Sequence, residues 1–193
     1  MGHKILIETS ARHVHLTQEH VEVLFGKGAE LTPAHELTQP GIFVSKEKVT
    51  LVGPKRTISG VSILGPVRPY TQVELSASDA RNLGINAPIG ESGELAGTAG
   101  CKIVGPDGEL EIEEGVMIVQ RHVHMKTATA EELGFHEKEL VCVKVNSEKR
   151  SLIFDDVVVH THPLVETFVH IDTDEANAAG IKGPVYGELI KKS

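Results

Sequence analysis

The sequence predicts a mainly β protein in which many short strands alternate with short helices. The chain of 193 residues has no Trp and only 4% aromatic residues, but it has 19 Gly and 9 Pro. Such a composition is typical of short strands and tight turns. The apolar stretches are short and are bounded by turn residues, and the helical segments are short and end at glycines. A chain of this length can form one domain or two small ones with a proper core.

Eight stretches have the composition of strands. Turn signals such as Gly53-Pro54 and Gly105-Pro106-Asp107-Gly108 bound them. In chain order, the expected strands are 4–9, 48–52, 61–64, 72–76, 102–104, 115–120, 140–145 and 152–160.

Four short helices are expected between these strands. The first covers 17–25 and stops at Gly26. The other three share one design: a residue that can cap the N-terminus, an acid three positions later, and a closing glycine followed by an apolar residue. They open at Ser76, Thr129 and Asp172 and close at Gly84, Gly134 and Gly180. Short capped helices between strands suit β-barrels with helical lids, not a parallel doubly wound sheet.

Charge and composition exclude several classes of partner. A net charge of -8 argues against nucleic acid. Nothing in the sequence resembles a signal peptide or an apolar span of about 18 residues, so no membrane partner is expected and the cytoplasm is the expected location. Cys101 and Cys142 lie far apart in apolar strand-like runs and are expected to be buried thiols, not ligands.

The tetrapeptide Arg-His-Val-His occurs twice, at 12–15 and at 121–124. Alternate side chains of a strand share one face, so each copy can direct two imidazoles into one space. Two converging imidazoles are half of a transition-metal site. Both copies run into a short helix, which indicates two related halves. The repeat therefore predicts two metals, or one metal shared by two halves; the competing interpretation is a pair of surface strands with exposed histidines.

Other side chains could complete these pairs. His160 and His162 form a third alternating pair and His170 lies in another strand-like run, but periodicity does not rank the three. Glu74 is an acid inside a strand, either a carboxylate ligand or part of a solvated face. Arg68, in a loop with two prolines, could hold a phosphate through paired N–H donors or could simply be exposed. Four histidines in polar or helical contexts are expected to be exposed: His3, His20, His35 and His136.

Several catalytic motifs do not occur in the sequence. It contains no G-x-x-x-x-G-K-[ST] phosphate loop, no G-x-G-x-x-G after a strand, no G-x-S-x-G elbow and no H-E-x-x-H. ATP, NAD and serine-hydrolase chemistry therefore lack support. Neither Cys has a cationic neighbourhood beyond one lysine, so a Cys nucleophile is not indicated.

Six motifs, in this order, together resemble one known family, the PduL-type phosphate acyltransferases. These proteins are best known as phosphate propanoyltransferases of bacterial microcompartments. The resemblance covers nearly the whole chain, roughly residues 5 to 181. The motifs lie at 10–16, 39–41, 64–68, 71–74, 120–124 and 170–177.

The resemblance implies two β-barrel domains capped by short α-helices. It also implies that the N-terminal strand is exchanged into the C-terminal barrel. One domain then comprises 1–11 and 120–193, and the other comprises 12–119 with a small excursion at about 26–46.

The resemblance also implies two zinc ions side by side and assigns their ligands. One zinc is assigned to His13, His15 and Glu74, and the other to His122, His124 and His170. Arg68 is implied as the catalytic residue that binds phosphate. The residues implied around coenzyme A are Thr9, Ser10, Ala11, Lys55 and Asn177.

The implied reaction is the reversible transfer of a short acyl group, acetyl or propanoyl, between coenzyme A and inorganic phosphate. A cytoplasmic location is expected, because the sequence shows no match to the N-terminal encapsulation extension of microcompartment members, and the resemblance implies a homodimer. Two alternatives are a di-zinc hydrolase that acts on thioesters and a non-catalytic metal-binding module.

The chain departs from the family pattern in two places. Gly90 stands where members typically carry Arg, and His160 and His162 stand in a stretch that often reads Arg-Val. Both departures bear on the substrate and coenzyme contacts, and hence on the acyl preference.

Overall fold

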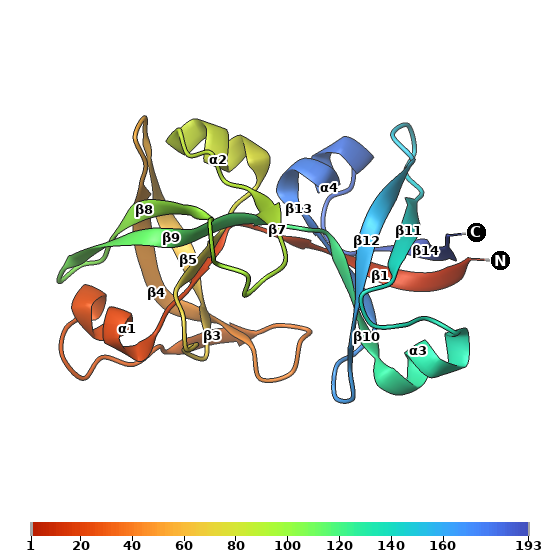
Figure 1. Ribbon diagram of the computed structural model, residues 1–193, viewed down its shortest axis with the longest axis horizontal. Helices are drawn as coiled ribbons and strands as arrows, with labels where there is room; N and C mark the ends of the chain where they lie inside the picture. The colour runs from red at the N-terminus through yellow and green to blue at the C-terminus, as the bar shows by residue number, and fades with distance from the viewer. Residues whose placement is uncertain (1, 193) are drawn as a thin grey trace. The chain divides into compact units, whose positions relative to one another are not determined.

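The protein is mainly β, as the sequence predicts. The computed structural model describes residues 2–192, and within them it has fourteen strands and four short helices (Figure 1). The chain divides into two compact units: one consists of the residues up to Ala11 and those from Gln120 onward, and the other is Arg12–Val119.

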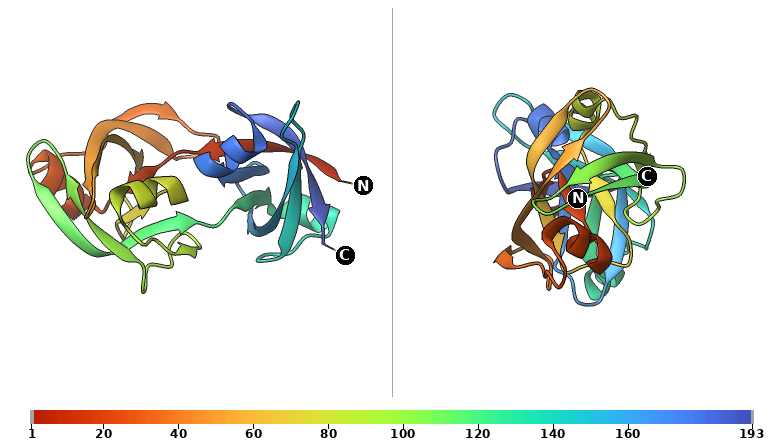
Figure 2. Two further views of the ribbon diagram at one scale, coloured as in Figure 1. Left: turned by 90° about the horizontal axis from the view of Figure 1, so that it is seen from above. Right: turned by 90° about the vertical axis from the view of Figure 1, so that its left-hand side faces the viewer.

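The unit that contains both ends of the chain is a closed six-stranded barrel. β1 pairs in parallel with β13 and antiparallel with β14, and Figure 2 shows the red first strand running among the blue C-terminal strands. The predicted exchange of the N-terminal strand into the C-terminal barrel is confirmed. Around the barrel, the order is β1 (His3–Ser10), β13 (Phe168–Asp172), β10 (His122–Lys126), β12 (Leu152–His162), β11 (Leu140–Val145) and β14 (Val185–Lys191).

The central unit is a second barrel with two short additions. β8 pairs with both β4 and β9, which closes a ring of six strands. The ring order is β4 (Phe43–Val52), β5 (Thr57–Gly65), β2 (His13–His15), β6 (Gln72–Glu74), β9 (Glu109–Val119) and β8 (Ala99–Val104). β3 (Pro33–Glu36) extends the sheet beside β4, and β7 (Ile89–Gly90) pairs with β9.

Each barrel has its own apolar core. Ile7, Val123 and Val169 are fully buried in the barrel formed by the two ends of the chain. Val14 and Val73 are fully buried in the central barrel. In both barrels, the valine inside the repeated His-Val-His points into the core, which leaves the flanking histidines on the opposite face.

The four helices are α1 (Gln18–Phe25), α2 (Ala77–Leu83), α3 (Thr127–Leu133) and α4 (Thr173–Ala179). Side chains of Thr17, Ser76 and Asp172 cap three of them, and Asp172 forms a full capping box with Glu175. The predicted cap at Thr129 is wrong. α3 begins at Thr127, so its N-cap is Lys126, three residues before the predicted one, and Lys126 makes no side-chain cap hydrogen bond.

The strand predictions missed some elements and shortened others. β14 and β3 were not expected, and β9 begins at Glu109 rather than near residue 115. In β9, Ile112 is buried between exposed acids, so the acidic side chains mask a strand whose ladder with β8 is extensive.

Two side chains are placed differently from their predictions. Cys101 is buried as expected, but Cys142 is only half-buried because it lies between Val141 and Val143, which point into the core. Its Sγ lies 3.5 Å from a carboxylate oxygen of Asp155. His20 is half-buried, not exposed, and its Nδ1 lies 2.6 Å from Oγ1 of Thr71.

Candidate metal sites

The first His-Val-His pair meets Glu74 because two short strands of the central barrel pair in register. In the antiparallel β2–β6 ladder, His13 lies opposite Glu74 and His15 lies opposite Gln72. Directly opposed residues share a face of the sheet, so the two imidazoles and the carboxylate converge. One ligand atom from each of His13, His15 and Glu74 lies within 4.8 Å of the others.

The donor atoms of this cluster point at one another. The Nε2 atoms of His13 and His15 are 3.2 Å apart. Each lies near a different Glu74 oxygen, at 3.3 Å from His13 and 3.4 Å from His15. Two nitrogens and a carboxylate this close suit one transition-metal ion such as zinc.

The protonation states of the cluster also suit a cation. Burial lowers the pKa of His15 from 6.5 to about 4, despite the opposing hydrogen bond with Glu74. Burial alone acts to raise the pKa of Glu74, but the charge and hydrogen bonds of His13 and His15 hold that pKa well below its usual range. At neutral pH, therefore, His15 has an unprotonated nitrogen and Glu74 is ionised, as metal ligands must be.

Polar neighbours hold the Glu74 carboxylate in place. The Gln72 amide donates to a Glu74 oxygen at 2.7 Å and to the Ser92 hydroxyl at 2.8 Å. The backbone N–H of Gly93 donates to the Gln72 carbonyl oxygen at 2.8 Å, which fixes the amide. Partners of this kind orient metal ligands. Sequence reasoning missed Gln72, although its position two residues before Glu74 places it on the same face.

Arg68 lies beside this cluster. Its backbone N–H donates to the carbonyl oxygen of Leu16 at 2.8 Å, which ties its loop to the end of β2. The side chain is half-buried, and its positive charge contributes to the lowered pKa of His15. The structure thus brings a cationic side chain near one of the predicted ligands, His15.

The second His-Val-His pair forms a cluster on the other barrel. In the antiparallel β10–β13 ladder, His122 lies opposite His170. One nitrogen from each of His122, His124 and His170 lies within 4.8 Å of the others. The Nε2 atoms of His122 and His124 are 3.1 Å apart, and His122 Nδ1 lies 2.9 Å from the carbonyl oxygen of Gln120. A carbonyl can only accept, so Nδ1 carries the proton and Nε2 keeps its lone pair for a cation.

The arginine of each repeat has a structural partner that sequence reasoning missed. Arg12 pairs with Asp79 of α2, with contacts of 2.8 and 3.0 Å to its two oxygens. Arg121 lies 3.3 Å from a carboxylate oxygen of Glu175 in α4. In both repeats, therefore, the arginine links the histidine-bearing strand to a short helix of its own barrel.

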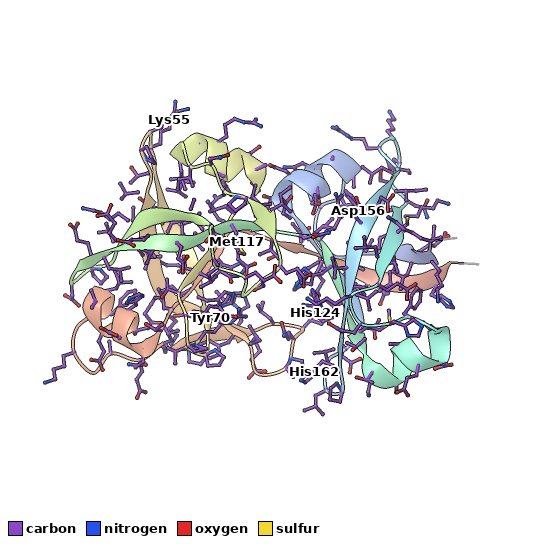
Figure 3. All side chains as sticks on the ribbon, viewed as in Figure 1. Lys55, Tyr70, Met117, His124, Asp156 and His162 are labelled. Carbon is purple, nitrogen blue, oxygen red and sulfur yellow. The ribbon has the colours of Figure 1, made fainter. Side chains whose placement is uncertain are left out.

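The third histidine pair is split. His160 faces the three-imidazole cluster, with its ring centroid 5.5 Å from that of His122. His162 is exposed at the end of β12, and its Nδ1 accepts from the Leu164 N–H at 3.2 Å; Figure 3 labels it together with His124.

The residues implied around coenzyme A fall in both units. Thr9 and Ser10 end β1, Ala11 follows them, and Asn177 is exposed on α4. Oγ1 of Thr9 is buried and has no hydrogen-bond partner among residues 2–192. Lys55 lies in the turn between β4 and β5, in the central unit.

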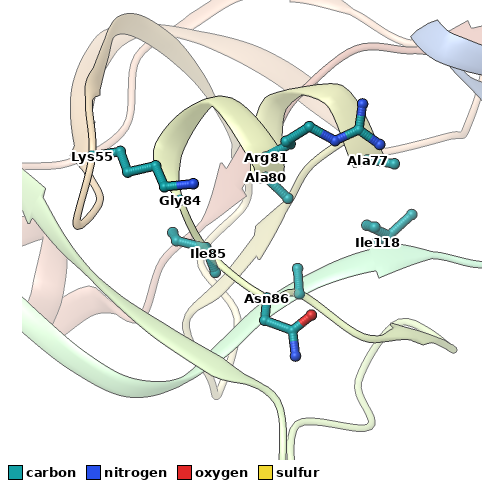
Figure 4. A pocket seen from close by; sticks show the side chains of 9 residues that line it. Lys55, Ala77, Ala80, Arg81, Gly84, Ile85, Asn86 and Ile118 are labelled. Atoms are coloured by element: carbon teal, nitrogen blue, oxygen red, sulfur yellow. The ribbon is translucent and has the colours of Figure 1, made fainter.

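A pocket of about 360 Å³ lies beside α2, and Lys55 lines it. Arg81 and Asn86 contribute further polar groups, while Ala80 and Ile118 give apolar surface. Figure 4 shows the Lys55 side chain near Gly84, where its carbons leave no room for a Cβ atom. The pocket thus combines two cations with an amide, a set that suits an anionic ligand.

These observations define a two-barrel protein with a candidate transition-metal site on each barrel. A model of the phosphate propanoyltransferase family matches residues 6–182. The chain belongs to this family, which is a family of acyltransferases.

Individual relatives agree with this assignment. The chain is 49% identical to a phosphate propanoyltransferase of Listeria monocytogenes over 97% of its own length and 87% of that protein. It is 51% identical to one of Thermotoga maritima, over 91% of this chain and 83% of the relative. A third, from Clostridioides difficile, is 46% identical over 98% of this chain and 90% of the relative. None of the helices among the described residues has the length and apolar character needed to cross a membrane.

Proposed function

We propose that the protein transfers a short acyl group, acetyl or propanoyl, reversibly between coenzyme A and inorganic phosphate, with one zinc ion at each histidine cluster. The observation that carries this proposal is the pair of three-ligand clusters in a chain of the phosphate propanoyltransferase family. The proposed ligands are His13, His15 and Glu74 for one ion and His122, His124 and His170 for the other.

Zinc at these clusters would supply a Lewis acid that stabilises negative charge on the departing sulfur and the reacting oxygens. The protein's contribution is to hold unprotonated nitrogens and an ionised carboxylate in place through Gln72, Ser92 and the Gln120 carbonyl. Because these groups are held before any ligand arrives, little reorganisation is needed at the moment of binding.

Arg68 is the proposed phosphate-binding residue. It is a half-buried cation beside His15, and its fork of N–H donors matches two phosphate oxygens. By aligning one phosphate oxygen with the thioester carbonyl carbon, it would favour formation of the C–O bond as the C–S bond breaks. No acyl-enzyme is required, because phosphate itself is the nucleophile.

The coenzyme contacts are proposed in two groups. The buried Oγ1 of Thr9 can accept or donate one hydrogen bond. The other three residues, Ser10, Ala11 and Asn177, lie near the same end of the barrel formed by the two ends of the chain. Lys55 can pair with a coenzyme phosphate. Arg81 lines the same pocket, so two positive charges there would attract the phosphate. We also propose, from the family resemblance, that the chain acts as a cytoplasmic homodimer; light scattering of the purified protein tests the dimer.

The decisive experiment measures CoA release from acetyl-, propanoyl- and butanoyl-CoA with and without phosphate. The proposal expects release to depend on phosphate and to yield one acyl phosphate per CoA. Equal rates in both conditions would instead show a thioester hydrolase. A protein that binds zinc but releases no CoA from any of the three would be a metal-binding module.

A further inference from the structure

A fourth imidazole lies on the same face as the cluster of His122, His124 and His170. In the parallel β10–β12 ladder, His160 is the partner of His124, and paired residues share a face of the sheet. Its ring centroid is 5.5 Å from that of His122, almost the same separation as the 5.4 Å between His122 and His170. Three neighbouring strands therefore bring four imidazoles together.

Glu137 lies beside one nitrogen of His160 and favours a proton on it. His160 Nδ1 lies 3.4 Å from one oxygen of Glu137, and the other oxygen accepts from both the backbone N–H and the hydroxyl of Thr161. An ionised carboxylate can only accept, so it favours a proton on Nδ1 and a lone pair on Nε2. A histidine that donates to a carboxylate through one nitrogen is the usual form of a metal-binding imidazole.

The neighbouring histidine lacks these features and provides a contrast. His162 uses Nδ1 to accept from the Leu164 backbone N–H at 3.2 Å. It pairs with Lys126, beyond the end of the His-Val-His stretch. It therefore belongs to the turn after β12, although sequence alternation gave both histidines the same standing.

We propose that His160 is a fourth protein ligand of the cation bound at His122, His124 and His170, and that Glu137 orients it. This inference rests on the proposed metal site. Three protein ligands leave one position open on a tetrahedral ion. His160 is not among the three residues whose nitrogens converge within 4.8 Å, so its ring must shift toward the ion, and its 28% exposure leaves room for that shift. His160 fills the open position when no substrate is bound. The Arg-Val residues that the family often carries in this stretch could not bind the ion in this way.

The test is a Co²⁺ titration of the metal-stripped full chain, followed by its visible absorption spectrum and by competition with a chromophoric chelator. The His160→Ala variant should bind one of its two Co²⁺ ions at least about tenfold more weakly. Loss of a residue that merely orients a ligand already lowers metal affinity by about this factor. The absorption of that ion should change, while the other ion is unaffected. Glu137→Gln should show a smaller weakening of the same ion, because the ring remains but its orientation is lost.

Control variants separate the possible failures. His162→Ala should match wild type in both affinities and in the spectrum. His160→Asn repeats the measurement if the alanine variant does not fold, as judged by circular dichroism. If His122→Ala loses one ion but His160→Ala binds both as wild type does, this inference is wrong and the proposed site stands. If His122→Ala also keeps both ions, the metal site itself is wrong. Unchanged metal affinity with a raised KM for phosphate would make His160 a substrate contact and overturn its role as a ligand.

Discussion

At the residue scale, the His-Val-His stretches owe their properties to strand alternation. Each central valine is fully buried in its barrel core, and each pair of histidines faces the other way with Nε2 atoms 3.1 to 3.2 Å apart. The arginine that precedes each stretch is engaged by a helix acid, Asp79 or Glu175. Every position of the repeated tetrapeptide thus has a physical reason, which explains why two separate barrels share it.

Replacing Glu74 tests the cluster on the central barrel. Glu74→Gln keeps the shape of the side chain but removes the negative charge between His13 and His15. We expect the variant to lose one of two bound zinc ions on dialysis and to lose nearly all phosphate-dependent CoA release. Inductively coupled plasma mass spectrometry of both proteins measures the metal content. Replacing the exposed Glu113 by Gln gives the matched control. Retention of both ions would remove Glu74 from the ligand set.

Replacing Arg68 separates phosphate binding from metal binding. A hydrogen bond to a charged group contributes about 1.5–3 kcal/mol, so Arg68→Ala should lower kcat/KM for phosphate roughly ten- to a hundredfold. The zinc content should stay near wild type, and Arg68→Lys should recover only part of the loss because it lacks the paired donors. Steady-state kinetics at varied phosphate concentration give the answer. Loss of zinc in the alanine variant would mean that Arg68 has a structural role instead.

The sequence predicted which candidate ligands lie together at each site, but it predicted few of the residues that hold those ligands in place. Motif order and resemblance gave the six candidate ligands that the structure brings together in two groups of three; their role as ligands stays a prediction. The residues that hold or orient these ligands do so through contacts between positions 2 to 24 apart in the chain; they are Gln72, Ser92 and Glu137. Such contacts depend on register and loop placement, for which a single sequence carries only the weak signal of alternation.

At the element scale, hydrogen bonds to one carboxylate hold the β3–β4 hairpin, which belongs to the excursion at about residues 26–46. The Glu47 carboxylate accepts from the Thr32 backbone N–H at 2.9 Å and from the Ser45 hydroxyl, on either side of the β3–β4 hairpin. Burial acts to raise the pKa of Glu47, but these hydrogen bonds outweigh it and leave that pKa below its ordinary value of 4.5.

This arrangement predicts a pH-dependent contribution to stability. Since the pKa of Glu47 is lower in the folded state, its contribution is present above about pH 4.5 and is lost as the pH falls through the folded-state value. Glu47→Gln should therefore lower the free energy of unfolding at pH 7 by about 1 kcal/mol or less, with a smaller difference near pH 3. Urea denaturation of both proteins at the two pH values measures it. A difference that grows on acidification would contradict the assignment.

The helices show what local sequence can and cannot determine. Ser76 and Asp172 cap their helices as predicted, because a cap acts within four residues. α3 begins at Thr127 instead, directly after β10, since the end of the strand sets where the chain can turn. β14 escaped prediction because Tyr186 and Gly187 interrupt its apolar alternation. Gly187 is required there, since an added Cβ would lie 2.5 Å from the backbone carbonyl oxygen of Lys144 in β11.

At the scale of the whole molecule, the two ends of the chain build one barrel together. β1 lies between β13 and β14, so its side chains complete a core otherwise made by residues beyond 120. Composition could indicate short strands and barrels, but no local signal pairs residue 6 with residue 168; the resemblance supplied that exchange.

Ile7 tests how far this barrel depends on its first strand. The side chain is fully buried, so Ile7→Ala should lower the free energy of unfolding by about 2–5 kcal/mol. The metal-free protein should be followed by denaturant titration, with the exposed Ile153→Ala as control. Because β1 pairs with β13, which carries His170, the variant should also bind the ion of the three-imidazole cluster more weakly. Equal stability of both variants would mean that β1 is dispensable to the core.

The pairing of the first strand with the last also orders events during synthesis. Residues 12–119 can close their barrel while translation continues, but β1 must wait unpaired until β13 and β14 have left the ribosome. A chain that stops before β13 and β14 cannot close the barrel whose strands carry His122, His124 and His170. A polypeptide that stops before β13 therefore leaves β1 without either neighbouring strand and lacks His170.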